Sequence, residues 1–287
     1  MSYLYWIHTC NNFDRTRFIP FKAGTHHVGW VRESFLPDLR HFPGIFRVQK
    51  DEVRIHSTIQ TFEDRTAAMQ EVLKYLQQKD LLPALYHELY PACALDSDQP
   101  PLFLLERAVV PLFGIRAFGI HLNGIVHKQG RCYMWIARRE MTRSSYPGLL
   151  DNLVGGGKSH ELTLWETMLK EAAEEAGIPH DLASQARGVS AINYCMETKN
   201  GLRQDVIVNY DLELPKSFQP YNQDGEVSEF YLWSLDQVQE MVISTKEFKT
   251  NCNLVIIDFL IRHGYISPDN PEYLALNQGL HPSFPQT

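Results

Sequence analysis

Residues 154–179, VGGGKSHELTLWETMLKEAAEEAGIP, constrain the fold of this chain most, because they define both ends of one helix. Thr163, followed three residues later by Glu166, forms a capping box in which each side chain binds a free backbone amide. Gly177 is the usual left-handed residue after a helix, and Pro179 cannot continue one. The spacing therefore predicts a helix of about a dozen residues that begins after Thr163. The apolar side that would dock on a sheet consists of Leu164, Met168, Leu169 and Ala172.

Three glutamates crowd the last turns of this helix. Glu171, Glu174 and Glu175 stand at i, i+3 and i+4, which stacks their side chains on one side. Each carboxylate costs roughly 0.3 to 1 kcal/mol beside the negative end of the helix dipole. A solvated polar face is the ordinary interpretation, whereas a bound divalent cation would remove the repulsion. The glycine-rich stretch ahead, with Gly156 and Gly157, lets backbone amides approach an anion, so both interpretations stay open on these residues alone.

Composition limits the classes of partner. The chain has 287 residues, 44% hydrophobic and 21% charged, which is typical of a globular protein. A formal charge of -7 without a basic stripe argues against nucleic acid. The apolar run from Tyr3 to Ile7 is too short for a signal peptide or a membrane span, so we expect a cytoplasmic location and no membrane partner. The five cysteines lie far apart, which excludes zinc ribbons and favours buried, reduced thiols.

Hydrophobic periodicity predicts an α+β chain. Residues 46–57 alternate like a strand or a hairpin, and residues 64–83 are spaced like an amphipathic helix, so the first third is expected to form a small α+β unit. The polar segment 94–101 ends in two prolines and is the best candidate for a linker. Strands are expected at 119–127, 132–139, 205–214 and 229–235, and further helices at 235–242 and 253–264. Strands mixed with a few helices, without strict alternation, indicate a layered domain with a mixed sheet.

The run GGKSHELTLWETMLKEAAEEAGI, residues 156–178, resembles the Nudix box. That pattern reads G, five residues, E, seven residues, then R-E-U-x-E-E-x-G-U, where U is aliphatic. With the register fixed on the first and last glycines, Glu171, Glu174 and Glu175 fall on the acidic positions. Two residues depart from it. Lys170 replaces an arginine and loses its rigid fork of donors, and Leu162 stands where the first glutamate is expected.

The resemblance extends over nearly the whole chain. YPGLLDNLVGGG, FKTNCNLVIIDFLIRHGYI and ERAVVPLFGIRAFGIHLNGIVH are similar to a Nudix branch with an extra N-terminal domain. This branch includes the Nudix portion of fungal thiamine pyrophosphokinase and plant plastid Nudix hydrolases. It implies a Nudix fold, with a mixed β-sheet between helices, preceded by a smaller α+β domain. We expect an N-terminal domain at 1–110, a Nudix domain at 111–267 and a C-terminal tail at 268–287.

The resemblance also implies a chemistry. Nudix enzymes hydrolyse a diphosphate linked to another group, with Mg²⁺, or Mn²⁺ as a substitute, held by carboxylates. Glu171 and Glu175 are the expected ligands, and Glu174 shares the roles of ligand and general base. Glu226, near the start of a late strand, is a further candidate acid. The alternative is that it is an ordinary loop residue. The expected substrate contacts are Gly156, Gly157, Arg138, Arg139 and Lys170.

Several alternatives stay open at this stage. His121 and Asn123 could touch the leaving group or simply be satisfied polar residues, and Trp135, Trp165 and Tyr146 could stack on a ring or lie in the core. Thiamine diphosphate or its oxidised analogues are the first substrates to try. The other options are a non-hydrolytic diphosphate-binding module and a nucleoside-diphosphate-sugar or ADP-ribose pyrophosphatase. An isopentenyl-diphosphate isomerase is a weaker option, because it needs a positioned cysteine and the sequence marks neither Cys132 nor Cys195 for that role. The N-terminal unit could be a substrate lid, a stabilising cover or the surface of a homodimer.

Overall fold

The computed structural model describes residues 1–82, 85–95, 97 and 99–285. A seven-stranded mixed sheet forms its centre, in the order β11-β12-β7-β8-β13, with β10 paired to β7 and β9 paired to β8. Strands β7 and β12 are parallel, and the other pairs in this sheet are antiparallel. The strands are β7 Arg116–Lys128, β8 Arg131–Arg139, β9 Leu150–Asn152, β10 Val154–Gly157, β11 Arg187–Thr198, β12 Gly201–Glu213 and β13 Val227–Ser234.

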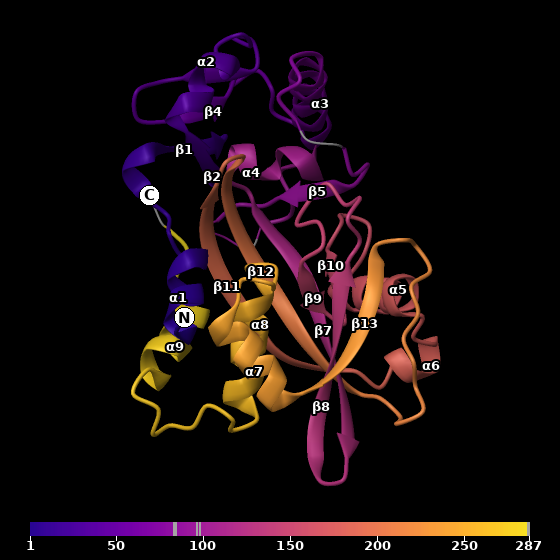
Figure 1. Cartoon of the computed structure of the whole chain (residues 1–287). Coiled ribbons are helices and arrows are strands. Elements are labelled where there is room, and N and C mark those ends of the chain that lie inside the picture. The colour runs from indigo at the N-terminus through magenta and orange to yellow at the C-terminus, as the bar shows by residue number, and fades with distance from the viewer. Residues whose placement is uncertain (83–84, 96, 98, 286–287) are drawn as a thin grey trace.

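Helices cover both faces of this sheet, as Figure 1 shows. On one face α5 and α6 bury an apolar side with residues of β7, β8 and β12. On the other face α8 packs with α7, α1 and α9. These helices are α5 Leu164–Ala176, α6 His180–Ala183, α7 Leu235–Ser244, α8 Cys252–Arg262, α1 Tyr3–Cys10 and α9 Tyr273–Leu280. The expected layered α+β architecture, with a mixed sheet between helices, is confirmed.

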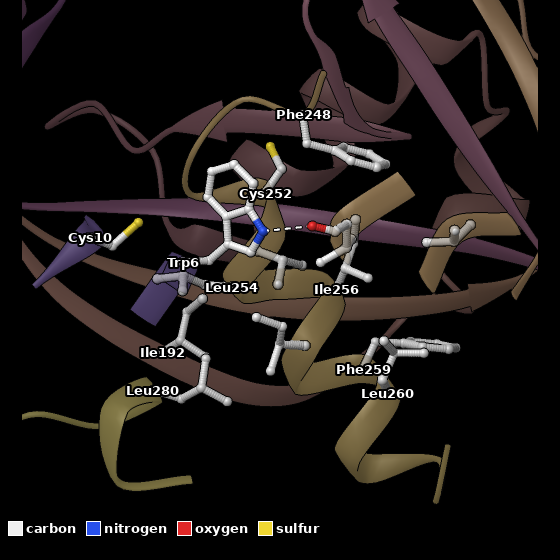
Figure 2. Packing of buried hydrophobic residues seen from close by; sticks show 14 of the residues in the cluster. Trp6, Cys10, Ile192, Phe248, Cys252, Leu254, Ile256, Phe259, Leu260 and Leu280 are labelled. Carbon is white, nitrogen blue, oxygen red and sulfur yellow. Dashed lines mark hydrogen bonds between the residues drawn. The ribbon is translucent and has the colours of Figure 1, made fainter. Parts of the chain in front are cut away.

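The core beneath α8 contains residues from both ends of the chain (Figure 2). Trp6 and Ile7 of α1 and Leu276 and Leu280 of α9 are almost fully buried there. The indole Nε1 of Trp6 donates a hydrogen bond to the carbonyl of Val242 (2.8 Å). Segments expected in the N-terminal domain and in a C-terminal tail therefore complete the core of the central sheet. The domain division at residues 110 and 267 stays a prediction, and the cores themselves divide elsewhere.

The N-terminal unit has its own core around a four-stranded sheet, in the order β2-β1-β4-β3, packed with α3. The hairpin expected at 46–57 is present as β3 and β4. Residues 94–101, of which 96 and 98 lie outside the described residues, connect the paired strands β5 and β6 within this unit, so the linker prediction was wrong. Its elements are β1 Phe18–Ala23, β2 His26–Arg32, β3 Phe46–Val48, β4 Val53–Ile55, β5 Leu89–Ala92, β6 Phe103–Glu106, α2 Leu36–Leu39, α3 Phe62–Gln78, α4 Val110–Phe113 and the 3₁₀ turns η1 Arg15–Arg17, η2 Glu33–Phe35 and η3 Arg107–Val109.

The N-terminal unit is seated directly on the hairpin of β11 and β12. Trp30 of β2 is fully buried in a small cluster with Cys195 and Leu202 of that hairpin. Arg32 Nη2 pairs with Glu197 Oε1 (3.0 Å) and donates to the carbonyl of Thr198 (2.6 Å). This contact is both apolar and ionic, and it holds the unit over one end of the central sheet (Figure 1).

Among the described residues, no helix is long and apolar enough to cross a membrane. All five cysteines are free thiols: Cys10, Cys195 and Cys252 are buried, whereas Cys93 and Cys132 are half-buried. The expectation of reduced thiols agrees with this arrangement, and three of the five are buried as expected.

Candidate active site

The glutamate helix forms as its local sequence predicts. Thr163 Oγ1 accepts the amide of Glu166 (3.2 Å), and Glu166 Oε2 accepts the amide of Thr163 (2.8 Å), so the capping box is complete. Gly177 caps the other end in the left-handed region, with φ of +61°. Buried Met168, Ala172 and Ala176 fix its rotation on the sheet. That rotation turns its acidic side towards β10.

Gly155, Gly156 and Gly157 belong to strand β10, paired with His121, Ile120 and Gly119 of β7, whereas the sequence suggested an open anion-binding loop. Lys158 donates its amide to the carbonyl of Phe118 (2.8 Å), so strand alternation directs the Gly156 amide towards β7 and the Gly155 and Gly157 amides away from it.

Each of these glycines leaves room for a neighbouring side chain. A Cβ at Gly156 would lie 2.4 Å from Glu171 Cγ, and one at Gly157 would lie 1.8 Å from Tyr90 Oη. The glycines are therefore needed for close packing, and the Gly156 amide is not free to bind an anion.

Glu175 is the most buried acid of the box. Its side chain accepts the Gly155 amide at Oε2 (2.9 Å), and the residue is only 5% exposed. Burial, with the neighbouring charges of Glu171 and Asp151, raises the pKa of Glu175 well above its usual range. Helix rotation places this side chain against β10 and not on a solvated face. A carboxylate here is unfavourable unless a proton or a cation compensates its charge.

Glu171 and Glu174 share a lysine. Lys170 Nζ contacts Glu174 Oε2 at 2.7 Å and Glu171 Oε1 at 3.3 Å. Burial raises the pKa of Glu171, and Lys170 opposes that rise. Lys170 thus offsets part of the repulsion among the glutamates.

These acids line a cavity of about 560 Å³ between the sheet, α5 and the N-terminal unit. Glu226 lines it too, paired with Arg143. The predicted residues that meet here are Gly156, Gly157, Arg139, Lys170, Glu171, Glu174, Glu175 and Glu226. One is absent from the described lining: Arg138 turns away, because neighbouring strand residues face opposite sides, and it donates to the carbonyl of Gly148 (2.8 Å).

A buried carboxylate organises the cationic side of the cavity. Asp151 Oδ2 pairs with Arg139 Nη1 (3.0 Å) and Lys249 Nζ (3.1 Å), and its Oδ1 accepts from Cys252 Sγ (2.7 Å). Burial alone would raise the pKa of Asp151, but the charges of Lys249 and Arg139 hold it well below its usual range. Arg139 and Lys249 both line the cavity, so Asp151 fixes two cations in the same lining as the glutamates.

In the described part of the chain, the one group of three metal-ligand side chains with ligand atoms within 4.8 Å of one another is His121, Asp151 and Cys252. Its carboxylate already faces Arg139 and Lys249, and these two positive charges oppose a further cation. We therefore interpret this group as a structural network. The carboxylate oxygens of the box glutamates are more widely spread, and Lys170 contacts two of them.

His121 is held in one tautomer by a chain of amides. Asp211 accepts the side-chain amide of Asn123 (2.9 Å), Asn123 accepts that of Asn152 (3.1 Å), and Asn152 Oδ1 lies 2.8 Å from His121 Nδ1. Because each amide oxygen is an acceptor, Nδ1 carries the proton and Nε2 does not. Burial lowers the pKa of His121 to about 4, so a neutral imidazole lines the cavity.

The other open candidates are also placed. Tyr146 lines the cavity, whereas Trp135 lies in the core and Trp165 packs near Tyr210. Neither Cys132 nor Cys195 is part of the described cavity lining, and burial raises the pKa of these thiols to about 11 and about 12. An isomerase that relies on either cysteine does not fit this geometry.

Sequence reasoning missed an entire wall of the cavity. Tyr86, Glu88, Tyr90 and Arg107 of the N-terminal unit line it, as do Arg203 and Asp205 of β12 and the turn 198–200. No local signal marks the residues of the N-terminal unit, because they meet β10 only through the docking of one unit on the other.

Comparisons with known proteins identify the family. Residues 2–117 match a family described as a domain of unknown function, DUF4743. Nudix hydrolase 20, chloroplastic, from Arabidopsis thaliana is 40% identical over 285 residues, which cover 96% of this chain and 76% of that protein. The chain belongs to the Nudix hydrolase family. Nudix hydrolase 24, chloroplastic, from the same plant is 41% identical over 265 residues, with 92% and 72% covered.

Among solved structures, the Nudix domain of Shewanella oneidensis NrtR in complex with ADP ribose is similar at 16% identity. The match covers 50% of this chain and 86% of that chain, with a TM-score of 0.40.

Membership settles the class of reaction. This Nudix hydrolase is a diphosphate-cleaving enzyme, and Nudix hydrolases generally use divalent metal ions. The resemblance stated from the box is thus confirmed. The roles of individual residues, the oligomeric state and the cytoplasmic location stay predictions.

Proposed function

We propose that this Nudix hydrolase uses Mg²⁺, with Mn²⁺ as a substitute, to cleave the diphosphate of a small organic diphosphate into a monophosphate and orthophosphate. The observation that carries the proposal is that one cavity is lined both by the box acids and by cations that a buried carboxylate holds in place. Glu171, Glu174 and Glu175 supply the acids, and Arg139 and Lys249 supply the cations. A diphosphate with its metal ion carries both kinds of charge and therefore complements both groups.

The donor set fits a hard divalent ion. Glu175 is buried and has one hydrogen-bond partner, the Gly155 amide, among the described residues. Its charge is disfavoured there by burial and by Glu171, so a cation between the two carboxylates would stabilise both. Glu171 and Glu175 are the proposed ligands, and Glu174 would join them on release from Lys170. When bound, the ion neutralises phosphate charge and lowers the pKa of a water.

The remaining residues bind and orient the substrate. Arg139 is held by Asp151 and by the carbonyl of Ser145, which leaves it little freedom to move away from a phosphate. Lys249 is held by the same carboxylate. Arg143 pairs with Glu226, so a phosphate that takes the arginine would free this acid to accept a proton from water.

The first substrates to try are thiamine diphosphate and its oxidised analogues, which the resemblance to the thiamine-related Nudix branch suggests. A cavity of about 560 Å³ is in the size range of sites for small organic molecules. ADP-ribose and nucleoside-diphosphate sugars are the alternatives within the same chemistry.

The test is a product analysis with the purified chain. We expect Mg²⁺ to support release of orthophosphate from at least one member of a panel of thiamine, oxidised thiamine, nucleoside and ADP-ribose diphosphates, and EDTA to abolish it. Pyrophosphate or two monophosphates as products would identify cleavage at another bond. No product from the whole panel, together with metal-dependent binding of one member, would refute hydrolysis of these compounds and favour a binding module.

A further inference from the structure

The N-terminal unit contributes a wall to the same cavity that contains the box glutamates. Tyr86, Glu88 and Tyr90 come from β5 and the segment before it, and Arg107 comes from η3. These residues lie within the 2–117 region described as a domain of unknown function. Figure 1 shows β5 beside the upper end of β10.

This wall is fixed from behind. Glu106 is 4% exposed, and its carboxylate accepts the amides of Tyr86 (2.6 Å), His87 (3.2 Å) and Ala108 (2.7 Å). It therefore ties the segment before β5 to η3. Arg107 donates its amide to the carbonyl of Glu88 (2.9 Å) and its Nη1 to the Glu88 carboxylate (3.0 Å). The side chains of the wall are thus held before any ligand arrives.

The wall is also fixed to the Nudix core. His160, after β10, donates its amide to the carbonyl of Leu89 in β5 (2.7 Å). Tyr90 is 5% exposed, and its hydroxyl occupies the space that a side chain at position 157 would need. The absence of a side chain at Gly157 thus brings the wall next to the box. A ligand whose phosphates lie at the glutamates would extend towards Tyr86 and Arg107.

Apart from the Glu88 carboxylate, the side chains of the wall that line the cavity are aromatic or donate hydrogen bonds. The Arg107 guanidinium lies 4.4 Å from the ring centroid of Tyr86 and 5.9 Å from that of Tyr90. Within the described residues, its Nε and Nη2 make no hydrogen bond, so these donors are available. Arg203 on β12, paired with Asp205 (2.6 Å), adds a second guanidinium to the lining. Flat rings with acceptor atoms match guanidinium groups and tyrosine rings together.

We propose that the N-terminal unit determines substrate specificity, and that Tyr86, Tyr90 and Arg107 hold the organic group of the diphosphate. The group that fits is a flat heteroaromatic ring with hydrogen-bond acceptors such as ring nitrogens or carbonyl oxygens. This inference rests on the proposed function, since the glutamates are taken to engage the diphosphate. It assigns a binding role to the domain of unknown function.

The test compares two substrates that differ only in the organic group. Arg107→Met keeps the length of the side chain and removes its donors. We expect kcat/KM for the best ring-bearing diphosphate of the panel to fall about tenfold or more, mainly through KM. For methyl diphosphate, which has no ring, kcat/KM should change less than twofold. Tyr86→Leu should show the same split, and Arg47→Met, on an exposed site of β3, should affect neither substrate.

Equal losses on both substrates, or no loss on either, would overturn the proposal. Thermal unfolding of each variant shows whether a loss of activity is caused by misfolding. If Arg107→Met is misfolded, the result for Tyr86→Leu decides between the outcomes. A direct binding assay covers the case in which no diphosphate is cleaved. Calorimetry with thiamine monophosphate, oxidised thiamine monophosphate and AMP needs no hydrolysis, and the tightest of these ligands should bind Arg107→Met about tenfold more weakly. Unchanged binding, or no binding to the unaltered chain, would overturn the inference while leaving the hydrolase proposal to its own test.

Discussion

The contact between Gly157 and Tyr90 gives a prediction about how the two units fit together. A Cβ at position 157 would lie 1.8 Å from Tyr90 Oη and 3.1 Å from Tyr90 Cζ. Gly157→Ala therefore forces the N-terminal unit and β10 apart. Overpacking of this kind costs about 1 to 3 kcal/mol. At roughly 2 to 4 °C per kcal/mol, Tm should fall by about 2 to 12 °C.

The Tyr90→Phe background should remove most of this cost. The hydroxyl is the closest atom, and without it the nearest contact is Tyr90 Cζ at 3.1 Å, which a shift of a few tenths of an ångström relieves. Tyr90 Oη has no hydrogen-bond partner within the described residues, so Tyr90→Phe alone should change stability by less than about 1 kcal/mol. We expect a coupling free energy of about 1 to 2 kcal/mol in the double-mutant cycle.

The assay is urea and thermal unfolding of the four proteins in the cycle, with Gly188→Ala as the control. A Cβ at Gly188 would meet Tyr210 at an ordinary 3.5 Å, so that substitution should be nearly neutral. If Gly157→Ala destabilised the Tyr90→Phe protein as much as the unaltered chain, the hydroxyl would not be the obstructing atom. The seating of the N-terminal unit on β10 would then differ from the one described.

Two further predictions concern charge. Glu175→Gln should lower kcat more than about 100-fold and yet raise the Tm of the metal-free protein, because it removes a buried carboxylate beside Glu171. Glu240→Gln, on an exposed site of α7, is its control, and full activity in Glu175→Gln would contradict the assignment. Arg54, and to a smaller extent Lys22, lowers the pKa of Glu52 to about 2. The ionised acid therefore stabilises the fold above its unfolded pKa of 4.5, and this stabilisation is lost as the pH falls towards 2. Glu52→Gln should cost about 1 kcal/mol at pH 7 and flatten the dependence of Tm on pH below 5; parallel curves for the two proteins would refute this.

The sequence predicted the glutamate helix closely because its ends depend on local chemistry. The capping box at Thr163 and the left-handed Gly177 involve residues only a few positions apart, so their contacts can be read from spacing. The strands that alternate strongly were also expected, and β7, β8, β12 and β13 are present. Of Arg138 and Arg139, one had to face away from the cavity, but the register that decides which is set by the whole sheet.

Long-range packing explains what was not predicted. β11 and the helices α1 and α9 were missed, and the last two are short helices that gain their stability by packing together on α8. The sequence suggested that the glycines form an anion-binding loop. Their close neighbours are Tyr90, which is distant in sequence, and Glu171, which follows after a turn, so spacing alone did not show that the glycines are needed for packing. The wall of the cavity that the N-terminal unit contributes was missed for the same reason.

The packing of α1 on α8 also constrains the order in which the chain can fold on the ribosome. Trp6 is synthesised 236 residues before Val242, whose carbonyl it binds, so the first helix must wait in an unfinished state while almost everything else is translated. A catalytic fragment produced from residue 111 onwards would lack Trp6, Ile7 and Cys10 and would expose the apolar surface that they cover. Attempts to isolate that fragment should therefore supply residues 3–10 as a separate peptide or fuse them after α9, where the two helices already touch.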